Sequence, residues 1–189
     1  MPNEFSQALP IADEGSGSPE IIYLAVGHAL TTWEGTEQAF AHLFARFIRP
    51  LRGSFVARRA FGAVQSSSGR SSLIDEAAEV FFRDFPSNDM QLRFRTVMKT
   101  YKDATAKRNQ IAHGIIMPSG PSLQKGHYLA ASMYTSKRRI DLSSPYYYTG
   151  ENIDHFRVLF GTMGYQTHNF VQAIDEHFRT SPASSRERY

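Results

Sequence analysis

Residues 94–115 read FRTVMKTYKDATAKRNQIAHGI, and their apolar side chains recur at alternating steps of three and four. This spacing places them on one face of an α-helix. Arg108 occupies one of the positions where the pattern expects an apolar residue. The stretch therefore predicts a long amphipathic helix, begun by Pro86-Ser87-Asn88-Asp89, with one cation along its buried face. The stripe consists of Phe94, Val97, Tyr101, Ala104, Arg108, Ile111 and Ile115.

Two further long helices are expected, one before and one after this stretch. The first starts with Ser18 as N-cap and Pro19 at the first helical position, and it ends before Pro50. The last starts with Thr149 as N-cap and keeps the same apolar spacing as far as Phe178. Two glycines on its stripe favour a close approach of another helix. They are Gly161 and Gly164.

Shorter elements are predicted between the long helices. Helices are expected over 55–64 and 73–82, the second capped by Ser72. A run of Pro and Gly then breaks the helical pattern, and residues 125–148 predict a β-hairpin insertion. Together these elements predict an all-α fold, a bundle of four to five helices with a small β-hairpin before the last helix.

The chain length predicts a single domain, which we place at 19–179. The hairpin within it has one arm around Leu129 and the other around Ile140. Residues 1–18 and 180–189 show no periodicity, so they are expected to form a flexible leader and a flexible tail.

A carboxylate interrupts the apolar stripe of the first predicted helix. Glu37 lies four residues after Trp33 and three before Phe40, so helical geometry directs it along the buried face. A buried carboxylate is costly without a partner. Pairing Glu37 with Arg108 satisfies both charges and makes Glu37 a supporting residue of the candidate site. In the alternative, the stripe is wide and Glu37 lies at its solvated edge.

The composition excludes several classes of protein. The chain has no Cys, which rules out disulfides, thiolate catalysis and cysteine zinc sites. Its first residues lack the basic start and apolar run of a signal peptide, and no apolar run is long enough to cross a bilayer, so we expect a cytoplasmic protein with no membrane partner. It has no zinc-protease motif, phosphate loop or dinucleotide fingerprint, so no cofactor or metal is expected. The net charge of +3 leans mildly towards anionic partners.

Arg108, Asn109 and His113 form the motif that carries chemistry. An imidazole can take or give a proton near neutral pH, and a guanidinium presents a forked cation to a phosphate. Asn109 could orient the His or hold the phosphate. Five helical steps place Arg108 and His113 about 140° apart around the helix, so one helix does not focus both on one phosphate. A two-fold pairing of this helix with its copy could bring them together, which suggests a homodimer.

The Arg-Asn-x3-His arrangement at the end of a long amphipathic helix resembles the HEPN superfamily, the higher eukaryote and prokaryote nucleotide-binding domains. The resemblance implies a helical bundle with the motif on the penultimate long helix. It also implies a dimeric, metal-independent ribonuclease, with Arg108 and His113 meeting at the subunit interface. Toxin–antitoxin or phage-defence roles are common in the family, so an antitoxin or regulatory protein is an expected partner beside RNA.

Four further cations are candidates for binding RNA. Lys102 and Lys107 flank the motif, and Arg138 and Arg139 lie at the hairpin turn, close to a run of three Tyr that could stack on bases. In the alternative, the hairpin is a packing or dimerisation element with a solvated charged tip.

The motif also has a purely structural interpretation. A His near a helix C-terminus favours the helix dipole, and a following Gly is a common C-cap, which would explain His113 and Gly114 without catalysis. Arg108 would then extend to solvent along its aliphatic stem. The HEPN superfamily also includes members without nuclease activity. The alternative function is therefore a non-catalytic module that binds RNA, a nucleotide or a protein.

Overall fold

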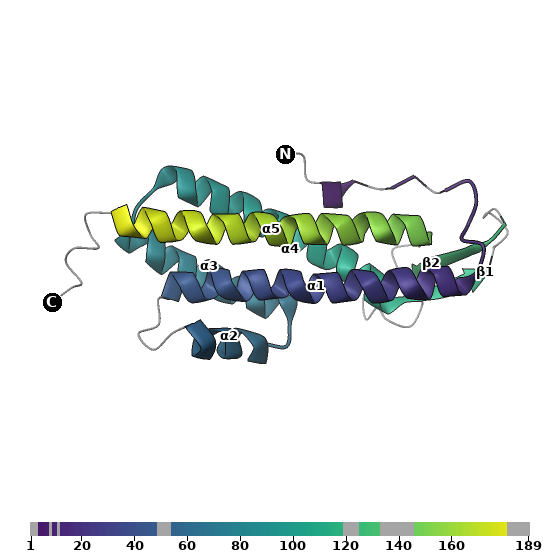
Figure 1. Ribbon diagram of the computed structural model, residues 1–189, viewed down its shortest axis with the longest axis horizontal. Coiled ribbons are helices and arrows are strands. Elements are labelled where there is room, and N and C mark those ends of the chain that lie inside the picture. The colour runs from purple at the N-terminus through teal and green to yellow at the C-terminus, as the bar shows by residue number, and fades with distance from the viewer. Residues whose placement is uncertain are drawn as a thin grey trace. The chain divides into compact units, whose positions relative to one another are not determined.

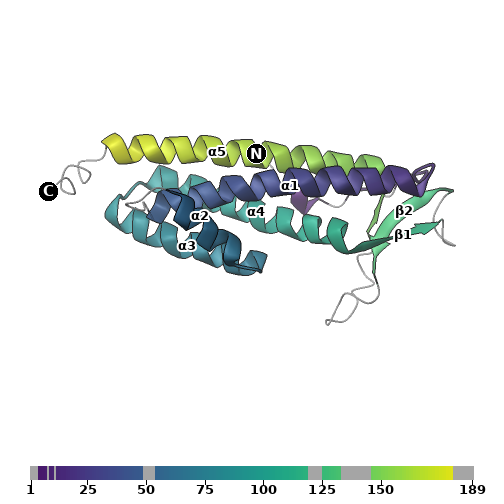
Figure 2. The same cartoon turned by 60° about the horizontal axis from the view of Figure 1, so that its bottom comes forward.

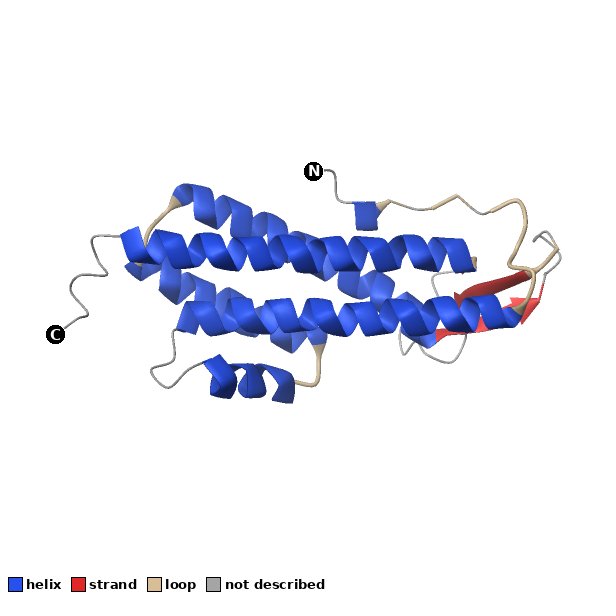
Figure 3. Cartoon of the chain, viewed as in Figure 1, coloured by secondary structure: helices blue, strands red, loops and turns tan. Residues whose placement is uncertain are grey.

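The computed structural model describes residues 4–7, 9–10, 12–48, 54–118, 125–132 and 146–180. Within these residues the chain is mainly helical, with a small antiparallel sheet, which confirms the predicted fold class (Figures 1 and 3). The elements are η1 (Glu4–Ser6), α1 (Pro19–Ile48), α2 (Ser54–Ala63), α3 (Ser67–Asp84), α4 (Asn88–His113), β1 (Gly114–Pro118), β2 (His127–Ala131), β3 (Tyr147–Tyr148) and α5 (Gly150–Thr180).

These elements form two compact units. The sheet unit comprises Met1–Glu34 and Asp103–Gly161, and the helical unit comprises Gly35–Lys102 and Thr162–Tyr189. The three long helices α1, α4 and α5 contribute residues to both. That residues 19–179 form a single domain stays a prediction. Of the predicted tail, 180–189, Thr180 is the last residue of α5 and the rest lies outside the described residues.

The long helices begin and end where their capping residues predict. α1 starts at Pro19 and stops at Ile48, two residues before Pro50. Before α5, the hydroxyl of Thr149 accepts a hydrogen bond from the Asn152 amide at 3.3 Å, while the Asn152 side chain accepts one from the Thr149 amide at 3.0 Å. This reciprocal capping satisfies two amide groups at once.

The start of α3 differs from the prediction. Ser66, and not Ser72, is its N-cap, with an extended backbone and a hydroxyl that accepts from the Gly69 amide at 3.0 Å. The helix therefore begins at Ser67, six residues before the predicted start. Ser and Gly clusters are typical of turns and also of helix starts, and here the cluster supplies the cap.

The sheet differs from the predicted hairpin. The predicted first arm is β2, but it pairs with β1 on one side and β3 on the other, all antiparallel. The second predicted arm, around Ile140, lies outside the described residues. β1 continues directly from the end of α4 (Figure 2). Its Ile115 fits the helical stripe of α4 by spacing alone, which is why the sequence did not reveal this strand.

The segment expected to form a flexible leader contacts the rest of the sheet unit at two points. Phe5 is buried and stacks on Phe160 with ring centroids 5.6 Å apart. Ser16 exchanges two backbone hydrogen bonds of 2.9 Å with His127 of β2, and its hydroxyl accepts from the Gly150 amide. A short aperiodic segment can dock through one aromatic side chain and a few backbone bonds, which leave no periodic signal in the sequence.

α1 and α5 approach each other closely at small residues. In the sheet unit Gly150 packs against Ile21 and Gly161 faces Thr32, so the two helices run in the same direction (Figure 1). In the helical unit a Cβ added to Gly164 would lie 3.2 Å from the Thr36 hydroxyl and 3.4 Å from its Cα. The close contact predicted from Gly161 and Gly164 is confirmed.

The same substitution at two glycines should have opposite effects on stability. Gly27→Leu should raise the free energy of unfolding by about 0.5–1 kcal/mol, because Gly27 faces open space and Leu is the better helix former. Gly164→Leu should lower it by about 1–3 kcal/mol, because the added atoms collide with α1. Urea unfolding followed by circular dichroism measures both. Equal stability of Gly164→Leu and wild type would contradict the close contact.

Candidate functional site

The motif lies in the last turn of α4, at an abrupt change from helix to strand. α4 ends at His113 and β1 begins at Gly114. A Cβ added to Gly114 would lie 2.7 Å from Leu129 Cγ and 3.0 Å from the Gln110 carbonyl oxygen. Among the described glycines, only Gly126 has a positive φ. Gly114 therefore does not adopt the left-handed conformation common at Gly C-caps. A glycine is needed here because β2 passes so close to this turn.

Gly114→Ala should lower the free energy of unfolding by about 1–3 kcal/mol, because its methyl group collides with Leu129. Leu129→Ala alone should also destabilise, since Leu129 is buried. In the double variant the new methyl group occupies space that Leu129 has vacated. The double variant should therefore lose less free energy of unfolding than the two single variants lose together. Strict additivity in urea unfolding would show that the two residues are not in contact.

The motif residues lie on two sides of α4, with Asn109 and His113 on one face and Arg108 turned away from His113. The Arg108 Nη1 donates to the Asn109 Oδ1 at 3.0 Å. The Arg108 side chain is half-buried, and its buried Nε has no hydrogen-bond partner among the described residues. Asn109 and His113 are both exposed and lie four residues apart, on one face. Within the described residues no hydrogen bond or ion pair joins Arg108 to His113, in agreement with their expected angular separation.

Lys107 lies against two aromatic side chains, Tyr148 of β3 and Phe156 of α5. Its ammonium donates to the Tyr148 hydroxyl at 3.3 Å and lies 5.5 Å from the centre of the Phe156 ring. No described carboxylate pairs with it, and burial lowers the pKa of Lys107. Lys107, a predicted phosphate contact, is thus a half-buried cation beside the motif.

Tyr148 of β3 and Tyr146, just before this strand, both form hydrogen bonds to Gln110 in the last turn of α4. The Tyr148 hydroxyl donates to the Gln110 side-chain Oε1 at 2.6 Å, and the Tyr146 hydroxyl donates to the Gln110 carbonyl at 3.0 Å. Gln110 is among the last four residues of α4, whose carbonyls lack helical partners, so Tyr146 caps the helix. Burial raises the pKa of both phenols, so both stay neutral donors. The sequence did not predict the role of Gln110, although the Tyr run beside the Thr149 cap was visible.

The other predicted RNA contacts are not part of this arrangement. Lys102 belongs to the helical unit, where its ammonium forms an exposed ion pair with Asp75 at 3.1 Å. Arg138 and Arg139 lie outside the described residues.

Glu37 is buried, as its place on the stripe predicted, but its cationic partner is not the predicted one. In the helical unit its carboxylate accepts from Arg70 Nη1 at 3.0 Å and from the Tyr101 hydroxyl at 3.0 Å. Arg70 also donates to the Val64 carbonyl at 2.9 Å. The predicted pairing of Glu37 with Arg108 is therefore wrong, and Arg70 is the cation that pairs with Glu37. Because Ser66 caps α3, Arg70 lies in the first turn of this helix.

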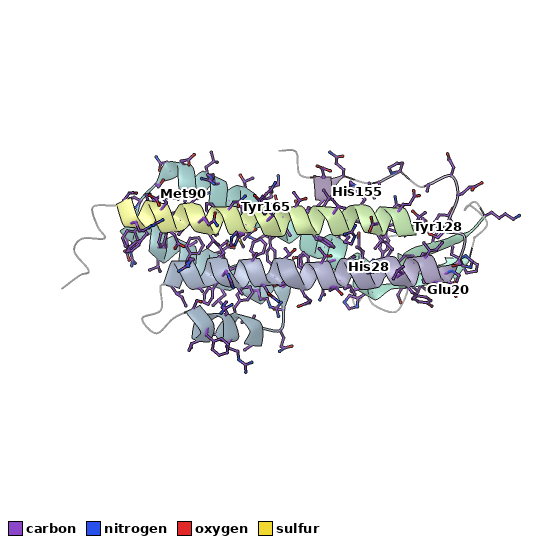
Figure 4. The ribbon with its side chains drawn as sticks, viewed as in Figure 1. Glu20, His28, Met90, Tyr128, His155 and Tyr165 are labelled. Carbon is purple, nitrogen blue, oxygen red and sulfur yellow. The ribbon has the colours of Figure 1, made fainter. Side chains whose placement is uncertain are left out.

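Outside the motif the described residues offer few other sites. Histidines such as His28 on α1 and His155 on α5 lie among exposed side chains (Figure 4). No three described His, Asp or Glu side chains gather to hold a metal ion. Nor is any described helix long and apolar enough to cross a membrane.

No family model, curated protein or solved structure matches this chain.

Proposed function

We propose that this chain is a metal-independent endoribonuclease that acts as a homodimer, with Arg108, Asn109 and His113 at the reacting phosphate. The observation that carries the proposal is the state of Arg108. Its guanidinium donates to Asn109 and has no carboxylate partner among the described residues, so no ion pair neutralises its charge. A cation with unused donors is suited to a phosphate, which accepts several hydrogen bonds at once.

The proposed reaction uses the RNA's own nucleophile. His113 takes the proton of a 2′-hydroxyl, and the 2′-oxygen attacks the adjacent phosphorus. The bond from phosphorus to the 5′-oxygen breaks, and that oxygen leaves with a proton from the imidazolium or from water. The products are a 2′,3′-cyclic phosphate and a 5′-hydroxyl. Arg108 stabilises the charge that grows on the phosphoryl oxygens, and Asn109 orients the guanidinium.

In the proposed dimer, the second copy of the chain supplies the Arg108 or His113 that one copy cannot bring to the same phosphate. Arg108 and His113 of a single α4 face different directions, so a shared cleft needs two helices. The strand that follows the motif supports an interface here, because Ile115 and Met117 of β1 expose 43% and 39% of their surface. Apolar side chains exposed beside a candidate site favour a protein contact.

The test is incubation of the purified protein with RNA in EDTA, followed by end analysis of the fragments and by light scattering to measure its mass in solution. Cleavage with cyclic-phosphate ends by a dimer is the expected result. Cleavage that requires an added divalent metal would overturn the proposed chemistry. From the HEPN resemblance we also propose a toxin or phage-defence role, with an antitoxin or regulatory protein as partner. Expression in a bacterial host would test this role.

One observation favours the second candidate, a non-catalytic RNA-binding or assembly module. The hydrogen bonds from Tyr146 and Tyr148 and the close contact at Gly114 account for the structure of the motif turn without any catalytic role. A well-folded dimer that binds RNA without cleaving it, and whose His113→Ala variant changes only the affinity, would establish this function instead.

A further inference from the structure

A row of aromatic rings leads from the core of the sheet unit to the surface beside the motif. The Phe156 ring is fully buried and contacts the Tyr148 ring edge-on, with centroids 5.2 Å apart. Tyr148 in turn stacks on Tyr146, with centroids 4.9 Å apart and planes 24° from parallel. Tyr148 is 4% exposed, whereas Tyr146 is only half-buried. The row therefore ends in a ring that has one face covered by Tyr148 and part of its surface open to solvent.

The outermost ring is fixed before any ligand arrives. Its hydroxyl is tied to the Gln110 carbonyl at 3.0 Å, and Tyr148 behind it is tied to the Gln110 side chain. A ring whose position is already set loses little conformational freedom on binding. Gln110 also places the Tyr146 ring near the motif. His113 follows Gln110 by three residues, so the two side chains are neighbours on the α4 surface.

We propose that Tyr146 is a stacking platform for a nucleobase of single-stranded RNA whose phosphate lies at Asn109 and His113. This inference rests on the proposed function and names its substrate class. A base placed on Tyr146 extends the row of rings by one member, and every base has a face that can stack in this way. The Lys107 ammonium lies 5.9 Å from the Tyr148 ring centre and adds attraction for the RNA backbone.

Stacking and capping can be separated by two substitutions. Tyr146→Phe and Tyr146→Leu both remove the hydroxyl that caps α4, but only Tyr146→Phe keeps the ring. The probe is a fluorescein-labelled, single-stranded 2′-O-methyl RNA oligonucleotide, which has no free 2′-hydroxyl and so cannot be cleaved by the proposed reaction. Tyr146→Phe should bind it like wild type, and Tyr146→Leu should bind it roughly tenfold more weakly, the size expected for one stacked base.

Tyr165→Leu is the matched control, since Tyr165 is an exposed tyrosine of α5 in the helical unit (Figure 4). Its affinity for the probe should not change. A second measurement needs no variant. Irradiation of the wild-type protein with RNA that carries 5-iodouridine should give a crosslink at Tyr146, mapped by mass spectrometry, so the inference remains testable even if Tyr146→Leu does not fold.

The outcomes distinguish this inference from the function on which it rests. Equal binding by the Phe and Leu variants, or crosslinks that avoid Tyr146, would overturn the platform while leaving cleavage by His113 intact. A loss of binding in Tyr146→Leu from a protein that does not cleave RNA would support the platform and reject the nuclease. Failure of wild type to bind the probe would overturn the platform directly.

Discussion

His113→Ala is expected to lower the rate of RNA cleavage in EDTA by about a hundred- to ten-thousand-fold, the usual contribution of a positioned acid or base. The imidazole is exposed at the end of α4, where a 2′-hydroxyl can reach it. Because His113 is the exposed last residue of α4, and Gly114 and Gln110 make the contacts of this turn, the substitution should leave the fold unchanged. Quantified gel analysis of a labelled RNA measures the rate, with circular dichroism and light scattering as controls of fold and mass.

Mixing two inactive variants tests whether the site is shared. Arg108→Ala and His113→Ala should each be inactive alone. If Arg108 of one protomer acts with His113 of the other, a mixed dimer contains one site with both residues intact, and activity should return on mixing. If both residues of one protomer form the site, every site in the mixed dimer lacks one of them. Persistent inactivity after proven subunit exchange would therefore rule out the shared cleft.

The sequence predicted the elements whose signals are local. The three-and-four spacing and the caps at Pro19 and Thr149 were sufficient for the long helices, since each signal lies within a few residues of the feature it specifies. β1 was missed because strand pairing is set by a partner elsewhere in the chain. Residues 114–118 become a strand only because β2 lies beside them, and helical spacing fits Ile115 equally well.

The candidate site was predictable in position but not in its contacts. The spacing of the motif correctly indicated that Arg108 and His113 face different sides, since helical angle follows directly from residue number. A periodic pattern tells which face a side chain occupies and not which partner it meets. Hence the sequence did not predict that Lys107 would lie against Phe156 or that Tyr146 would cap Gln110.

The same limit explains the partner of Glu37. Its burial followed from the stripe of α1, and the need for a cation followed from the cost of a buried carboxylate. Two opposite charges on apolar stripes suggested that Arg108 was that cation. Arg70 was not predicted as the partner because the helix was expected to begin at residue 73, whereas α3 begins at Ser67 and its first turn brings the Arg70 guanidinium to Glu37.

Arg70→Met should therefore have a large effect on stability, lowering the free energy of unfolding by about 2–3 kcal/mol. Met keeps an unbranched apolar stem but removes the cation from a carboxylate whose side chain is only 6% exposed. Breaking a fully buried pair by removing one partner costs about 3–5 kcal/mol, and we expect less because the Arg70 side chain is 23% exposed. The bond to the Val64 carbonyl and the contact with the Phe61 ring are lost as well.

A double-mutant cycle separates the charge from these other contacts. Glu37→Gln removes the negative charge while keeping the shape of the side chain, so Arg70→Met should cost less in that background, by about 1–2 kcal/mol. Lys102→Met is the control for a cation in the same unit, since its exposed pair with Asp75 should contribute less than about 1 kcal/mol. If Arg70→Met cost the same with Glu and with Gln at position 37, the stabilisation would come from packing and the Val64 bond, and the ion pair with Glu37 would contribute nothing measurable.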